Sequence, residues 1–95
     1  MNDLLELWLA HKGAGWPTFS DPNQGELMTL DTVISGCVTY YLDSEEGLDP
    51  QRVVMLEECL ADLNGLLPDL PDEAAAYFER ARTLACLLLA ASPRR

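Results

Sequence analysis

The stretch that decides the fold is Pro71-Asp-Glu-Ala-Ala-Ala-Tyr-Phe-Glu-Arg-Ala-Arg-Thr-Leu-Ala-Cys-Leu-Leu-Leu-Ala-Ala91. Its apolar side chains recur at steps of three and four residues, which is the spacing of one helix face. We therefore expect a helix over 72–91. The face that forms the seam of the fold is expected to carry Ala74, Tyr77, Phe78, Ala81, Leu84, Ala85 and Leu88.

The second half of this helix has no polar side, because every residue from 84 to 91 is apolar. A helix that is apolar all round must be covered by its own fold or by a second chain. Either the first helix or a second subunit could cover the apolar residues outside the seam. The sequence thus names a candidate surface for a homodimer, made of Cys86, Leu87, Leu89 and Ala90.

A third helix is predicted over 50–64. Asp49 is a suitable N-cap, and Pro50 suits the first helical position, where an amide hydrogen would have no partner anyway. Asn64-Gly65 is expected to end the helix, with Gly65 in a left-handed turn. Because the Pro-containing joint to the last helix is short, the two helices should pack as an antiparallel hairpin.

The first half of the chain is less regular. A short helix over 3–11 is expected, with Asn2 as its cap. Residues 12–28 show no clean period and predict a long loop. Residues 30–43 fit a helical face but also a strand-like alternation, and we choose a helix because no partner strand is evident. Gly36 within this helix indicates that another backbone passes close to it.

Taken together, these patterns predict a single all-α domain over 1–95. Its architecture is a small four-helix assembly built on the antiparallel C-terminal helix hairpin. A chain of 95 residues suits one core of modest size.

The charge balance is strongly negative, with 16 Asp and Glu against 6 Lys and Arg and a formal net charge of −10. No basic residue lies between Gly13 and Gln51. Such a surface disfavours direct binding to nucleic acid or to an anionic membrane, and it attracts basic protein partners. The simpler interpretation is that the charge keeps a small apolar-rich protein in solution.

Cysteine usage favours a reducing compartment. The three cysteines at 37, 59 and 86 form no Cys-x-x-Cys pair, and the chain begins without a basic, signal-like segment. The apolar run at 84–91 is far shorter than the roughly 20 residues that span a bilayer. We therefore expect a cytoplasmic protein that does not enter the membrane.

No set of residues predicts catalysis, a metal or a cofactor. His11 is the only histidine, and a single histidine at a helix end is expected to cap carbonyls or face solvent. His11 and the three cysteines match no zinc spacing. The paired carboxylates are adjacent in sequence, so they do not face one another on a helix. We expect a protein that is not an enzyme.

What remains is a binding surface. The aromatic residues are of the type found at interface centres, and acidic residues neighbour them in sequence. The candidate partner-binding residues are Trp16, Phe19, Tyr40, Tyr41, Asp43, Glu45 and Glu46. The predicted function is a small acidic protein-binding module, such as a regulator, inhibitor or immunity-type protein that engages a basic partner. The alternatives are a homo-oligomeric structural module with the C-terminal helix as its interface and an acidic mimic of nucleic acid. The aromatic residues at 16 and 19 could equally close one end of the core.

Overall fold

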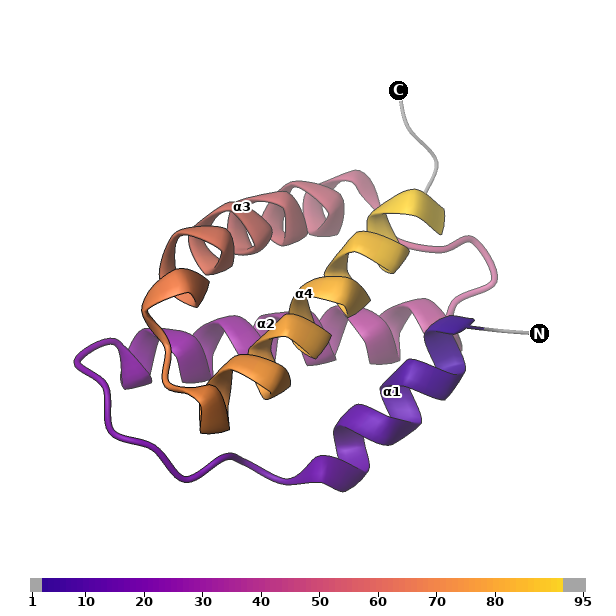
Figure 1. The fold of residues 1–95 in the computed structure, drawn as a ribbon. Helices are drawn as coiled ribbons and strands as arrows, with labels where there is room; N and C mark the ends of the chain where they lie inside the picture. The colour runs from indigo at the N-terminus through magenta and orange to yellow at the C-terminus, as the bar shows by residue number, and fades with distance from the viewer. Residues whose placement is uncertain (1–2, 92–95) are drawn as a thin grey trace.

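The computed structural model describes residues 3–91, and the cap expected at Asn2 lies outside them. Within this range the chain forms four α-helices and no strand. They are α1 (Asp3–Ala14), α2 (Gln24–Asp43), α3 (Pro50–Leu66) and α4 (Asp72–Ala91), with a 3-10 turn, η1 (Leu67–Asp69), before α4. Figure 1 shows α3 turning through η1 into α4, which runs back across the other helices. The all-α bundle predicted from the sequence is confirmed.

Helix α4 is the centre of the bundle, since it packs against each of the other three helices. The predicted seam is buried along its whole length except at Tyr77, which is half-buried. Alanines at positions 74, 81 and 85 are fully buried and let neighbouring helices approach closely. Each fully buried Leu or Phe contributes roughly 1.5–3 kcal/mol relative to remaining exposed, and α4 supplies three: Phe78, Leu84 and Leu88.

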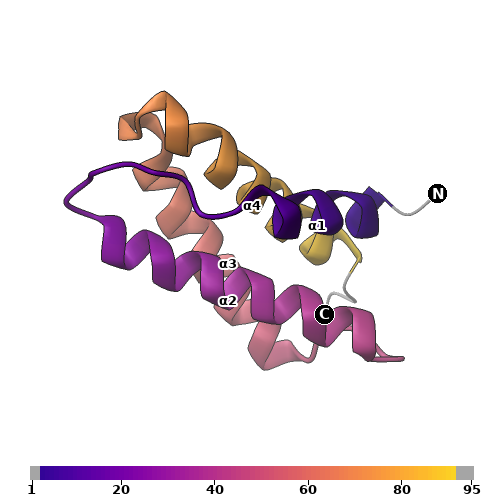
Figure 2. The same cartoon turned by 90° about the horizontal axis from the view of Figure 1, so that it is seen from below.

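The α1–α2 connection is shorter than the sequence predicted. α1 continues past residue 11 to Ala14 and is stopped by Gly15 with φ +73°. α2 begins at Gln24 rather than near residue 30, because Asp21 forms a turn whose side chain accepts from the Asn23 amide at 2.8 Å. Fully buried Leu27 anchors the added turn of α2 in the core. Figure 2 shows the remaining loop passing beside the start of α4 before it turns into α2.

Two predictions about glycines are wrong. Gly65 does not end α3: its φ is not positive, and the helix continues through Leu66 into η1, where buried Leu67 holds the chain on the core. A Cβ built on Gly36 would meet nothing within 4 Å, so no other backbone lies close to it. The cap of α3 is as expected, because the Asp49 side chain accepts from the Arg52 amide at 2.9 Å.

Candidate functional site

A concave surface lies where α2 turns into α3, and we call it the α2–α3 groove. It has a volume of about 610 Å³, within the range of ligand-sized pockets. Its carboxylates come from α3 and from the connector between α2 and α3 (residues 44–49). They are Glu45, Glu46, Asp49 and Glu57. Its apolar lining is formed by Tyr40, Leu48, Pro50, Val53 and Val54. None of the described residues that line it is basic.

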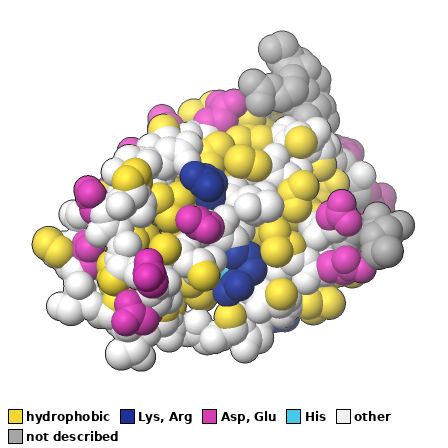
Figure 3. Space-filling view, in the orientation of Figure 1, with side chains coloured by type: hydrophobic (Ala, Val, Ile, Leu, Met, Phe, Trp, Pro, Cys, Tyr) yellow, Lys and Arg dark blue, Asp and Glu magenta, His cyan; other side chains and the backbone are white. Residues whose placement is uncertain are grey.

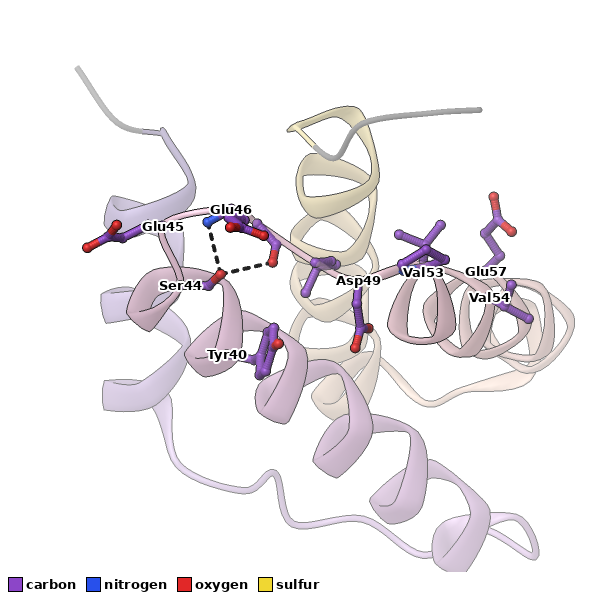
Figure 4. A pocket seen from close by; sticks show the side chains of 11 residues that line it. Tyr40, Ser44, Glu45, Glu46, Asp49, Val53, Val54 and Glu57 are labelled. Carbon is purple, nitrogen blue, oxygen red and sulfur yellow. Dashed lines mark hydrogen bonds between the residues drawn. The ribbon is translucent and has the colours of Figure 1, made fainter.

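The groove owes its shape to the folding of the connector. Ser44 Oγ donates to the Gly47 carbonyl at 3.1 Å and accepts from the Glu46 amide at 3.1 Å. Gly47 has φ +81°, a conformation that glycine adopts without strain. Buried Leu48 then fixes the connector to the core just before the cap of α3. Figure 4 shows Tyr40 on α2, Asp49 where the connector enters α3, and Val53, Val54 and Glu57 along α3, with Glu45 extending away from α3.

The groove brings together three of the seven predicted partner-binding residues: Tyr40, Glu45 and Glu46. Two others lie next to it on α2. Tyr41 is half-buried and lines a shallower hollow shared with Glu45 and Glu46. Asp43 lines a second hollow that also contains Tyr40 and Arg52.

Trp16 and Phe19 lie elsewhere. Their rings pack against Phe78 of α4, with centroid distances of 5.5 and 6.1 Å. The loop that carries them precedes α2, whereas the groove follows it, and the 20 residues of α2 extend roughly 30 Å. The two sets of predicted residues therefore do not form one surface. The positions of Trp16 and Phe19 agree with closure of one end of the core.

The four residues proposed for self-association lie on α4, but they are not equally accessible. Leu87 and Leu89 are half-buried and packed against the core, whereas Cys86 and Ala90 are exposed. Buried Leu4 and Trp8 place α1 on α4, so α1 takes part of the covering role. Self-association through the remainder stays a prediction.

A buried polar cluster joins three helices, and sequence reasoning missed it. His11 is only 4% exposed, which contradicts the expectation of a solvent-facing or carbonyl-capping residue. Its Nε2 lies 2.9 Å from Asp31 Oδ1, and Arg80 Nε donates to its Nδ1 at 3.1 Å. The Tyr77 hydroxyl donates to Asp31 Oδ2 at 2.9 Å. Because guanidinium nitrogens only donate, the proton of the neutral imidazole is assigned to Nε2.

Both imidazole nitrogens in this cluster are engaged by protein groups, so the ring has no free nitrogen to take a substrate proton. Its role is to satisfy polar groups inside the bundle. The three hydrogen-bonded pairs of the cluster are 20, 46 and 69 residues apart in the sequence. No local spacing could have revealed them, although Tyr77 and Arg80 do lie one turn apart on α4. In Figure 3 only a trace of histidine is visible beside a basic side chain.

The cluster predicts a loss of stability at alkaline pH. Burial first, then the hydrogen bond to Asp31 and the charge of Asp31, raises the pKa of Tyr77 above its ordinary value of 10.0. Above pH 10 the unfolded chain releases the phenolic proton while the folded chain keeps it, so the unfolded state gains stability. We expect this to cost roughly 1 kcal/mol at pH 11.

The measurement is urea unfolding of the wild type and of Tyr77→Phe at pH 8 and pH 11. The variant should lose less stability over this interval. It should still lose some, because burial also raises the pKa of Cys37 and Cys59 above 9.0. An equal loss in both proteins would show that the Tyr77 proton is not linked to folding.

In the part that the structure describes, no three His, Cys, Asp or Glu side chains are grouped as metal ligands would be. None of the described helices is long and apolar enough to cross a membrane. Comparisons of the chain with protein-family models, curated proteins and solved structures found no match.

Proposed function

We propose that this protein is a binding module that holds a basic segment of a partner protein in the α2–α3 groove. The observation that supports the proposal is the combination of four carboxylates with an apolar lining in one concave surface. Lysine and arginine side chains match both features, because their aliphatic stems bury along apolar surface while the charged ends reach carboxylates. The net charge of −10 adds long-range attraction for such a segment.

The apolar lining distinguishes this proposal from mimicry of nucleic acid. A mimic presents regularly spaced charge, whereas Val53, Val54 and Pro50 give the groove contact area that does not depend on charge. A partner segment should therefore contain apolar residues next to its basic ones. Its binding should weaken with salt, because screening acts on the carboxylates. Some affinity should survive, because salt does not screen apolar contacts.

The test is fluorescence anisotropy with a labelled peptide of alternating arginine and leucine. At 50 mM salt we expect saturable binding that weakens at 500 mM. The variant Glu45→Gln/Glu46→Gln should bind about threefold to tenfold more weakly, as two partly solvated charge pairs are lost.

The matched control is Glu73→Gln/Glu79→Gln, which removes the same charge from exposed positions on α4. It should change the affinity by less than the groove variant does. No saturable binding by the wild type would contradict the proposed function. Equal losses of affinity in the two variants would mean that binding depends on the overall negative charge of the protein rather than on the groove.

A further inference from the structure

Arg52 lies beside the α2–α3 groove and already makes contacts of the kind that the groove would offer a partner. Its guanidinium carbon lies 3.8 Å from the centroid of the Tyr40 ring. Its Nη1 lies 2.9 Å from Asp49 Oδ2. Tyr40 and Asp49 both line the groove, and Arg52 lines the neighbouring hollow. The one arginine of α3 thus covers a ring face and a carboxylate oxygen that belong to the groove.

We propose that Arg52 is an internal competitor for the partner, and that the partner residue which replaces it is an arginine rather than a lysine. The inference rests on the proposed function and deepens it. A planar guanidinium can stack on the Tyr40 ring and bind the Asp49 carboxylate together, as Arg52 does. An ammonium group is a compact, strongly hydrated charge without a flat face, so it gains less from the same pair.

The geometry allows Arg52 to leave without unfolding α3. Its side chain and that of Asp49 are 38% and 39% exposed, so their ion pair is solvated and weak. The cap of α3 uses the Arg52 amide and Asp49 Oδ1, not the guanidinium. Displacing the Arg52 side chain therefore exposes the Tyr40 ring and one carboxylate oxygen and retains the cap.

The variant Arg52→Gln tests this inference, with Arg82→Gln as its matched control. Arg82 Nη1 donates to Asn64 Oδ1 at 3.4 Å, and the loss of Arg82 changes the net charge by the same amount. The probes are two peptides of equal length that alternate leucine with arginine or with lysine. Circular dichroism at increasing temperature should show that Arg52→Gln unfolds at nearly the wild-type temperature, since its cap remains.

We expect the wild type to prefer the arginine peptide. Arg52→Gln should bind that peptide about threefold more tightly than the wild type does, by freeing a cation–π site. The gain in affinity for Arg82→Gln should be clearly smaller, because that substitution changes only the net charge of the protein. Binding to Arg52→Gln that is equal to that of Arg82→Gln, or weaker than wild type, would overturn the inference, as would a preference for lysine. If neither peptide binds any of the three proteins, the proposed function fails together with the inference.

Discussion

Phe78→Ala is expected to destabilise the protein by roughly 3 to 5 kcal/mol, the usual cost of truncating a fully buried phenylalanine. Phe78 has no exposed surface and lies at the middle of an aromatic group. The rings of Trp16, Phe19 and Tyr77 lie 5.5, 6.1 and 5.0 Å from it, all at steep interplanar angles. Since domains of this size are stable by about 5–15 kcal/mol, the variant should be near the limit of folding.

Urea unfolding followed by tryptophan fluorescence measures this effect. Trp16 is 38% exposed in the folded protein, and the loss of Phe78 removes one of the rings that hold its loop on α4. The tryptophan signal, to which Trp8 and Trp16 both contribute, should therefore begin to change at lower urea than the helical signal does. The control is Met28→Ala on α2, whose side chain is 51% exposed and should cost less than about 0.5 kcal/mol. Comparable losses in the two variants would mean that α4 is not the centre of the core.

The C-terminal half of the fold, which contains Phe78, was predictable from the sequence. For α4, the spacing of the apolar residues, the length of the apolar pattern and the prolines before it all indicate the same helix. Six of the seven predicted seam positions are buried in the structure. In α3 the Asp49-Pro50 start is a local signal that needs no tertiary information. Its end was misplaced because buried Leu67, rather than the conformation of Gly65, decides where the chain leaves the helix.

The start of α2 could not be predicted in the same way. Residues 24–29 include a glycine and have weak helical periodicity, so local preference does not favour a helix there. The burial of Leu27 and the turn at Asp21 supply the missing stabilisation. These are tertiary contacts, and they make the loop end earlier than predicted, at Gln24. The extension of α1 to Ala14 makes the same loop begin later than predicted.

The candidate site was predictable only where its residues are neighbours in sequence. Tyr40, Glu45 and Glu46 meet in the groove because they are close in sequence: Tyr40 lies near the end of α2, and the two glutamates lie on the connector that follows it. The contributions of Val53, Val54 and Glu57 depend on how α3 turns back beside α2, which no spacing in the sequence specifies. The stacking of Arg52 on Tyr40 is likewise a contact between two helices. The same limit hid the cluster around His11.

Asp31→Ala is expected to cost roughly 2 to 4 kcal/mol, because it leaves buried donors without their acceptor. Asp31 accepts from His11 Nε2 and from the Tyr77 hydroxyl, each at 2.9 Å. The His11 side chain is 3% exposed, so water cannot readily replace the lost partner. The substitution also removes the negative charge from a cluster that contains Arg80. Asp31→Asn should cost less, since its amide oxygen can still accept one of the two hydrogen bonds.

Urea unfolding of Asp31→Ala and of Asp62→Ala separates the cluster from the general effect of charge. Asp62 is an exposed carboxylate on α3, so its removal should change the stability by no more than about 0.5 kcal/mol. Adding Tyr77→Phe to Asp31→Ala should cost less than Tyr77→Phe does in the wild type, because the hydroxyl has already lost its acceptor. Strict additivity of the two changes would contradict a direct bond between them. Coupling of about 1 kcal/mol would identify the Asp31 carboxylate as a group that ties α4 to α2 through the Tyr77 hydroxyl.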